Sequence, residues 1–280
     1  MHRREFSFII KVNPHGGINH QEVAMTKIVA IANQKGGVGK TTTAVNLAAC
    51  TAQAGKRVLL VDVDPQGNAT SGVGVDKDAC EFSVYDVLIN EVEAEKAIVK
   101  TRIDTLDVIP SRIELAGAEV ELVPMMARER KLRTALKETA KKYDYVFIDC
   151  PPSLGLLTLN ALTAANTLLV PIQCEYYALE GLAQLMNTVK LVRQHLNDDL
   201  EVEGVVMTMY DARTNLSPMV VGEVKKFFRN KVYETVIPRS VRLGEAPSFG
   251  LPITLYDPKS AGAAAYRNLA KELLERDGNK

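Results

Sequence analysis

The chain has 280 residues, with 34 Lys and Arg against 34 Asp and Glu, so its formal net charge is zero. This balance argues against permanent binding to nucleic acid or anionic membrane through bulk charge. With 46% hydrophobic and 24% charged residues, the composition is that of a globular protein with a large core, which excludes disorder, collagen and long coiled coils. The apolar runs are strand-sized and too short to span a membrane.

The first 24 residues differ from the rest of the chain. They combine Arg3 and Arg4 with a short apolar stretch that a polar, glycine-containing run interrupts. They lack the apolar length and the small-residue cleavage site of a secretory signal. We expect a mobile N-terminal extension over residues 1–24 and a single domain over residues 25–280.

From Lys27 onward, short Val, Ile and Leu runs alternate with helical patterns, which predicts parallel strands joined by helices. Several runs are apolar almost throughout, as in strands buried on both faces. The expected strands are 28–33, 57–63, 106–109, 145–148, 167–171, 202–209 and 232–237. The expected helices are 40–54, 128–142, 156–165, 179–195, 218–229 and 259–276. The sequence therefore predicts an α/β fold with a doubly wound, mostly parallel sheet flanked by helices.

One of these helices carries explicit start and packing signals. Ser217 is expected to cap it and Pro218 to occupy its first position. Val220, Val224, Phe227 and Phe228 are expected to form its inward stripe.

The first strand leads into a glycine-rich run and then a helix, which is the context of a phosphate-binding P-loop. Backbone N–H groups of such a loop and the following helix N-terminus bind phosphate oxygens. Lys40 is expected to reach the β and γ phosphates of ATP, and the Thr41 hydroxyl to bind Mg²⁺. The expected nucleotide contacts in this run are Lys35, Gly36, Gly37, Val38, Gly39, Lys40, Thr41 and Thr42.

Two further strands end in carboxylates. The second strand leads into Asp62 and Asp64, which alternation along a strand would place on the same side. Asp64 is expected to orient the attacking water or to hold the Mg²⁺ hydration shell. Asp149 ends the strand over residues 145–148, as a Walker B aspartate does, and is expected to act on Mg²⁺ directly or through water. Two prolines then stiffen a loop that could respond to the γ phosphate.

The four cysteines fall at no metal-finger or disulfide spacing. Cys150 lies beside the expected Walker B aspartate but has no partner at a useful spacing, so we interpret it as a small buried residue. An iron-protein reductase would need paired cysteines that hold a shared cluster, and this pattern does not favour one.

The P-loop run departs from the usual motif because Gln34 stands where the first glycine is common, and Lys35 follows as an extra lysine. It therefore resembles the deviant Walker A motif. The segments 171–182, 210–215 and 238–248 are similar to those of the ParA/Soj family of chromosome-partitioning ATPases. The resemblance implies an ATP-dependent homodimer in which Lys35 reaches the partner's phosphates and stabilises transition-state charge. It also implies that Asp64 positions the water, that the dimer binds DNA non-specifically, and that a ParB-type centromere-binding partner stimulates slow hydrolysis.

Local charge supports DNA binding independently of the resemblance. Residues 211–245 hold seven basic and four acidic side chains, and clustered cations are what phosphate contacts need. Arg213 and Arg242 match DNA-binding arginines of the family, the alternative for each being a surface salt bridge. Pro238 matches an adenine contact, the alternative being a simple end to its strand. We expect a cytoplasmic, nucleoid-associated protein.

Two alternatives remain from the sequence. A MinD-type membrane-surface ATPase would carry the same nucleotide motifs and end in a basic amphipathic helix. Residues 267–277 instead hold three basic and three acidic side chains, and Leu269 and Leu273 are expected to face the core, so we expect no stable membrane association. The second alternative is a nucleotide-switched regulator of another DNA-bound protein, because the extension is too short for a helix-turn-helix.

Overall fold

The computed structural model describes residues 26–176 and 182–278. The expected mobile extension over residues 1–24 lies outside the described residues, as do residues 179–181 of the helix expected over residues 179–195. Within the described ranges, no helix is both long and apolar enough to cross a membrane.

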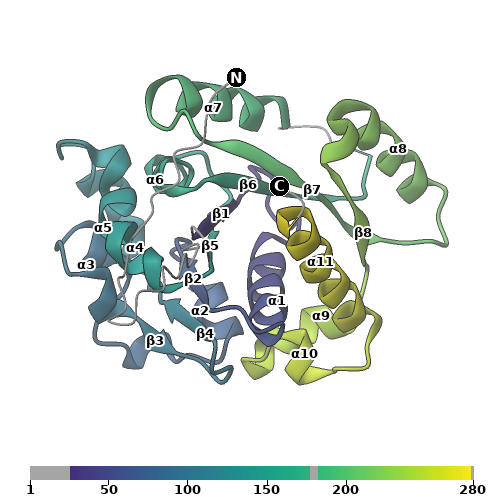
Figure 1. Ribbon diagram of the computed structural model, residues 1–280, viewed down its shortest axis with the longest axis horizontal. Coiled ribbons are helices and arrows are strands. Elements are labelled where there is room, and N and C mark those ends of the chain that lie inside the picture. The colour runs from purple at the N-terminus through teal and green to yellow at the C-terminus, as the bar shows by residue number, and fades with distance from the viewer. Residues whose placement is uncertain (1–25, 177–181, 279–280) are drawn as a thin grey trace, which may run out of the picture.

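One eight-stranded sheet carries the fold, with the order β3-β4-β2-β5-β1-β6-β7-β8 (Figure 1). All seven expected strands are present, and all pair in parallel. The two-residue β3 is an addition, antiparallel to β4 at the sheet edge, and is too short to produce an alternation signal. The strands are β1 Lys27–Ile31, β2 Val58–Asp62, β3 Val99–Lys100, β4 Leu106–Ile109, β5 Tyr145–Asp149, β6 Thr167–Gln173, β7 Glu201–Tyr210 and β8 Val232–Pro238.

Helices cover both faces of the sheet, which confirms the doubly wound α/β prediction (Figure 1). The six expected helices correspond to α1, α5, α6, α7, α8 and α11, whereas the short helices α2, α3, α4, α9 and α10 were not predicted. The helices are α1 Lys40–Gln53, α2 Asn68–Gly72, α3 Val84–Leu88, α4 Leu115–Glu121, α5 Lys131–Thr139, α6 Leu156–Ala164, α7 Leu182–His195, α8 Leu216–Phe228, α9 Val241–Glu245, α10 Ile253–Tyr256 and α11 Ala261–Gly278.

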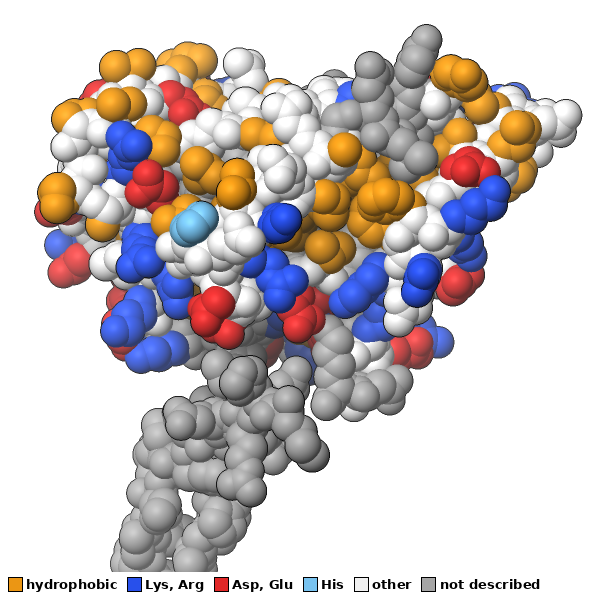
Figure 2. Space-filling model, turned by 90° about the horizontal axis from the view of Figure 1, so that it is seen from above, with side chains coloured by type: hydrophobic (Ala, Val, Ile, Leu, Met, Phe, Trp, Pro, Cys, Tyr) orange, Lys and Arg blue, Asp and Glu red, His pale blue; other side chains and the backbone are white. Residues whose placement is uncertain are grey.

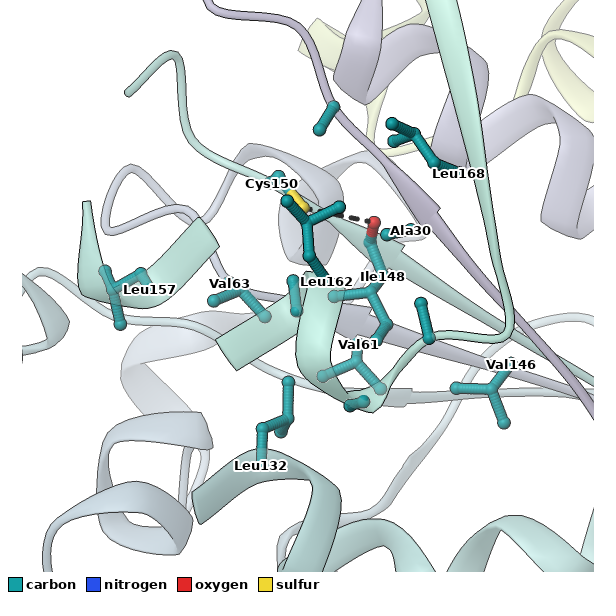
Figure 3. Close-up of a cluster of buried hydrophobic side chains, with 14 of the residues drawn as sticks. Ala30, Val61, Val63, Leu132, Val146, Ile148, Cys150, Leu157, Leu162 and Leu168 are labelled. Atoms are coloured by element: carbon teal, nitrogen blue, oxygen red, sulfur yellow. Dashed lines mark hydrogen bonds between the residues drawn. The ribbon is translucent and has the colours of Figure 1, made fainter. Parts of the chain in front are cut away.

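Two hydrophobic clusters, one on each face, hold the layers together. Every residue of β2 and β5 is buried, because alternate side chains enter opposite clusters. Ile148 of β5 packs with α6 and α7 residues in one cluster, and Phe147 packs with α1 and α11 residues in the other. Figure 3 shows part of the first cluster, in which Cys150 lies among Leu157, Leu162 and other apolar side chains.

The environment of Cys150 agrees with its interpretation as a buried structural residue. Its thiol donates only a long hydrogen bond, 3.8 Å from Sγ to the Ile148 carbonyl oxygen, drawn in Figure 3. Burial, together with the nearby Asp149 carboxylate, raises the pKa of the thiol. A thiol held protonated in this way is a poor nucleophile.

The predicted start of α8 was wrong by two residues. The helix begins at Leu216, so Pro218 lies within its first turn, not at its first position. Ser217 is buried inside the helix, and its Oγ accepts a hydrogen bond from the Asp211 backbone N–H at 3.1 Å instead of capping the helix. Proline is tolerated there because the first helical N–H groups have no intrahelical partner.

The predicted inward stripe of α8 is also partly wrong. Val220 and Val224 are buried, but Phe227 is 62% exposed. Phe227 lies in the last turn of the helix, where its ring packs edge-on against Phe228 at a centroid distance of 5.0 Å.

The carboxyl ends of the three central strands meet at one edge of the sheet. Ile31 at the end of β1 is in register with Asp149 at the end of β5, and Asp149 is in register with Asp62 at the end of β2. The chain leaves β1 toward β2 on one side, whereas β6 pairs with β1 on the other side. Open α/β sheets bind ligands at such a switch point.

Candidate functional site

The loop between β1 and α1 has the backbone conformation that phosphate binding requires. Gly37 and Gly39 adopt positive φ angles of 74° and 85°, which favour glycine over residues with a Cβ. Gly39 directly precedes the first residue of α1 and has no side-chain cap to offer. The helix therefore begins with free N–H groups, and its partial positive charge favours an anion there.

Two polar side chains that sequence reasoning did not single out brace this loop. The Thr208 hydroxyl, from the buried strand β7, donates to the Val38 carbonyl oxygen at 2.8 Å. Asn33 uses its amide N–H to reach the Pro171 carbonyl at 2.8 Å and its Oδ1 to accept from the Lys35 N–H at 3.0 Å. The signal that could have identified them is a polar side chain within or directly after a continuously apolar strand.

Lys40 is directed into the loop. Its side chain is buried, and Nζ donates to the Lys35 carbonyl oxygen at 3.0 Å. Burial lowers its pKa, while the carboxylates of Asp149 and Asp64 act in the opposite direction. A phosphate group would be a stronger partner than one carbonyl oxygen, because charge-assisted hydrogen bonds are roughly twice as strong as neutral ones.

Lys35 leaves the loop in a different direction. Its Nζ is 3.5 Å from Oε2 of Glu175, which follows β6, and its side chain is 34% exposed. The second carboxylate oxygen of Glu175 is 3.9 Å from the guanidinium of Arg239. Glu175 therefore connects the P-loop lysine to the end of β8. It belongs to a segment that carried the family resemblance, but sequence reasoning gave it no role.

Asp149 is a buried carboxylate that lacks partners. Neither of its oxygens has a hydrogen-bond partner within normal geometry among the described residues. Burial and the neighbouring Asp62 raise its pKa well above the ordinary value, although a contact with the Thr41 hydroxyl, too poorly aligned to count as a regular hydrogen bond, and the charge of Lys40 lower it. Buried polar groups without partners are rare, and a bound cation would satisfy such oxygens.

The two aspartates after β2 have different surroundings. Asp62 is fully buried and accepts hydrogen bonds at 2.8 Å from both the backbone N–H and the hydroxyl of Thr70. Burial raises its pKa to about 6 against these hydrogen bonds. Asp64 lies beyond the end of the strand and accepts one hydrogen bond, from the Gln66 N–H at 3.0 Å. The side chain of Asp62 thus anchors α2, whereas Asp64 keeps free acceptor capacity.

The donor set fits Mg²⁺ held jointly with a nucleotide. Among the described residues no group of three or more His, Cys, Asp or Glu side chains forms a metal cluster. Mg²⁺ commonly takes one or two protein oxygens and completes its shell with phosphate oxygens and waters. The hydroxyl of Thr41 and the orphaned oxygens of Asp149 would supply the protein oxygens.

The expected DNA-binding residues and adenine contact lie near the carboxyl ends of β7 and β8 and on the helix after β8. Pro238 ends β8 and is in register with Tyr210, the last residue of β7. Arg213 follows that strand end within three residues, whereas Arg242 is on the separate helix α9. The structure brings Lys40, Thr41, Asp64 and Asp149 together, and it places Arg213 and Pro238 at the adjoining strand ends.

Most of the expected basic cluster is paired with acidic neighbours. Arg213 forms a two-pronged contact with Asp211, at 2.8 and 2.7 Å, and holds the pKa of that carboxyl far below its usual range. Arg242 reaches Glu245 at 3.0 Å and Asp257 at 3.6 Å. Figure 2 shows Lys and Arg interspersed with Asp and Glu on the face above α7 and α8. The local excess of cations is therefore not a continuous polycation.

The site is that of a P-loop ATPase. It combines the strand β1, the glycine-rich loop that follows it, the buried Lys40 and the buried carboxylate of Asp149 at the end of β5. A family model described as an AAA domain matches residues 26–202. The chain is 64% identical over 249 residues to the sporulation initiation inhibitor protein Soj of Bacillus subtilis (strain 168), which covers 89% of this chain and 98% of that protein. It is 54% identical over 254 residues to the chromosome partitioning protein ParA of Myxococcus xanthus (strain DK1622), covering 91% and 90% of the two chains.

A solved structure is similar over the same range. Cobyrinic acid a,c-diamide synthase from Mycobacterium smegmatis, with bound ADP and magnesium, superposes with a TM-score of 0.80 at 42% identity, covering 91% of this chain and 96% of that one. The sequence and structural similarities together place the chain in the ParA/Soj family of chromosome-partitioning ATPases.

Proposed function

We propose that this ATPase forms a homodimer on binding ATP·Mg²⁺, that the dimer binds DNA non-specifically, and that a ParB-type partner stimulates hydrolysis. The backbone from Gly36 to Thr42 would hold the phosphates, with Lys40 neutralising their charge. Thr41 and Asp149 would hold Mg²⁺, which supplies Lewis-acid stabilisation of the phosphoryl oxygens when bound. Pro238 would pack against adenine.

The observation that carries the proposal is the divergence of the two loop lysines. Lys40 already occupies the interior of the loop, while Lys35 points out of it toward Glu175. A second lysine that leaves its own phosphate site is available to the phosphates of another subunit. Since the pair with Glu175 is partly exposed, it is worth about 1 kcal/mol or less and phosphate would displace it.

The same contacts support a link between nucleotide and DNA. Glu175 lies between Lys35 and Arg239, and Arg239 donates its backbone N–H to the Tyr210 carbonyl at 3.0 Å, next to the strand end that leads to Arg213. Moving Lys35 toward a partner's phosphates would leave Glu175 with Arg239 and the side-chain amide of Gln173 as its partners. Pairing two subunits would also double the phosphate contacts, on which DNA affinity depends steeply.

Hydrolysis would depend on Asp64. One oxygen of its carboxylate accepts from Gln66 and the other can still accept a hydrogen bond. Its charge acts on the pKa of both Lys40 and Asp149. A carboxylate in this position would orient a water for in-line attack, and Lys35 from the partner would stabilise the charge that develops, as an arginine finger does.

The membrane-surface alternative finds less support. Leu269 and Leu273 of α11 are buried in the core, as expected from the sequence. The flanking charges of the helix pair internally, Arg276 with Glu272 at 2.7 Å and Lys271 with Glu275 at 3.7 Å. The apolar stripe of this helix is therefore not available to lipid.

The test compares Lys35→Ala with Lys56→Ala. Lys56 is an exposed lysine just before β2, at the amino end of the strand and hence at the opposite edge of the sheet. Light scattering after size exclusion, with and without ATP·Mg²⁺, should show dimers for wild type and Lys56→Ala, and ATP-bound monomers for Lys35→Ala. A gel shift on random DNA should follow the dimer. A Lys35→Ala variant that dimerises normally would remove the proposed role of this lysine.

A further inference from the structure

An exposed apolar and acidic surface lies along the segment around α4. We define the α4 surface by Ile113, Val120, Val123 and Met126, whose side chains are between 52% and 89% exposed. Large apolar side chains gathered on one short segment are unusual for a surface that faces only water. Figure 1 shows α4 beside α5 and α6, on the face of the sheet opposite α1 and α11.

The charge of this segment is of one sign. Residues 113–127 contain Glu114, Glu119 and Glu121 and no Lys or Arg. Glu114 is exposed, and its Oε2 lies 4.0 Å from Nε of Arg112, just before the segment, a long pair that an incoming cation can displace. Glu121 is exposed and accepts from the Tyr85 hydroxyl at 2.9 Å. A second copy of the chain in a two-fold contact here would bring one acidic surface against an identical acidic surface, which is unfavourable.

The third carboxylate connects the α4 surface to the nucleotide site. Glu119 accepts hydrogen bonds from the first two backbone N–H groups of α6, Leu156 at 2.8 Å and Leu157 at 3.4 Å. It packs so closely on Gly155 that a Cβ at that position would lie 2.4 Å from its Oε1. A movement of α4 would therefore move the start of α6.

The start of α6 is joined to the catalytic edge by a short, stiff loop. Only residues 150–155 separate it from Asp149, and two of them are prolines, which restrict the backbone. The Thr158 hydroxyl ties the loop back to the helix through the Ser153 carbonyl at 2.6 Å. Asp149 is the proposed Mg²⁺ ligand, so α4 has a contiguous connection to it.

We propose that the α4 surface docks a basic, amphipathic segment of the hydrolysis-stimulating partner, and that Glu119 transmits this docking to Asp149 through the start of α6. The inference rests on the proposed function, because it locates the partner and the route by which the partner acts. Apolar side chains of the segment bury Val120 and Met126, and its cations pair with Glu114 and Glu121. Glu119 is a positioning residue, since it acts through α6.

The experiment measures ATP turnover of the full chain with random DNA, as a function of the concentration of the purified ParB-type protein from the same organism. The double variant Val120→Ser/Met126→Ser should raise the half-saturating partner concentration roughly tenfold or more, with unchanged basal turnover and ATP-dependent DNA binding. Leu255→Ser, a comparable truncation of an exposed leucine on α10, should behave as wild type. Glu114→Lys provides a second variant, which should weaken binding of the partner and reduce the salt dependence of stimulation.

Glu119→Gln separates docking from transmission. It should keep the half-saturating concentration and lower the maximal stimulation, because the neutral amide holds the α6 N-terminus less strongly. A normal half-saturating concentration in both surface variants would overturn the docking site. Loss of ATP-dependent dimerisation in the double variant would overturn it too, by showing a subunit contact. Absence of stimulation in wild type would instead refute the proposed function and, with it, this inference.

Discussion

The two aspartates at the ends of β5 should respond oppositely to neutralisation. Asp149, at the carboxyl end, is fully buried without a hydrogen-bond partner in the described structure. Asp144, just before the strand, accepts from the Arg57 backbone N–H at 2.7 Å and from its guanidinium at 2.9 Å. The same Asp→Asn change therefore removes an unfavourable buried charge at one end and a favourable contact at the other.

The magnitudes follow from burial. Leaving a buried polar group without a partner costs about 1–3 kcal/mol, and more when the group is charged. The amide of Asp149→Asn stays buried, so this variant should stabilise the nucleotide-free protein only by the extra cost of the charge, about 1 kcal/mol. For a chain of this size, 1 kcal/mol corresponds to a Tm shift of about 2–4 °C. Asp144 is partly exposed, so losing its ion pair should destabilise the protein by at most about 1 kcal/mol.

The assay is thermal unfolding at pH 7.5 without nucleotide, with ATP and EDTA, and with ATP and Mg²⁺. A ligand at 100 times its Kd stabilises the folded protein by about 2.7 kcal/mol, and Asp149→Asn should lose the part of this gain that depends on Mg²⁺. Asp144→Asn should keep it. Refutation would come from an Asp149→Asn variant that melts below wild type without nucleotide, or that retains the full Mg²⁺-dependent gain.

The pH dependence supplies a further check at Asp144. Hydrogen bonds from Arg57 hold the pKa of this carboxyl below its ordinary value of 3.8. A carboxyl with a lowered folded-state pKa stabilises the protein above the unfolded-state value, and this stabilisation is lost as the pH falls through the folded-state pKa. The stability difference between wild type and Asp144→Asn should thus be fully present at neutral pH, begin to shrink near pH 3.8 and disappear once the pH is below the lowered folded-state pKa. A difference that persists in acid would show that the contact acts through shape alone.

Three other substitutions test the remaining site residues. Lys40→Ala should lose nucleotide binding by at least tenfold, measured by fluorescent ATP titration, because a buried cation no longer faces the phosphates; unchanged affinity would contradict its role. Asp64→Ala should bind ATP and dimerise but hydrolyse it at least tenfold more slowly in a phosphate-release assay, and normal turnover would exclude it as the water-orienting group. Arg213→Glu should leave ATP affinity unchanged and weaken random-DNA binding with a shallower salt dependence, whereas an unaltered gel shift across salt concentrations would remove it from the DNA contact.

The sheet and the phosphate loop could be predicted from sequence because their signals are local. Strands buried on both faces, such as β2 and β5, read as continuous apolar runs, and all seven predicted strands were found. The glycines before Lys40 are needed for backbone conformation, which depends on nearby residues alone. The short helices α9 and α10 were missed because a single turn has too few residues to show a helical period.

The bracing contacts could not be predicted because they join residues far apart in the chain. Thr208 is 170 residues from the carbonyl it supports, and Glu119 is 37 residues from the helix it caps. Neither spacing has a sequence signature, because packing of the finished sheet decides which side chains meet. Phe227 shows the converse: a helical period assigned it to the core, yet its position in the last turn leaves it exposed.

The ion pairs of the proposed DNA surface explain how a neutral chain could bind DNA only when switched. Arg213 and Arg242 are both well exposed, so solvent screens their pairs with Asp211 and Glu245 and the pairs contribute little to stability. A DNA phosphate therefore has little to displace, but each contact also gains little after that exchange. One subunit with few such contacts binds weakly. Two subunits joined across their nucleotides present twice as many phosphate contacts on one surface. Because the free energies of these contacts add, their individual contributions to the association constant multiply, and DNA affinity rises steeply.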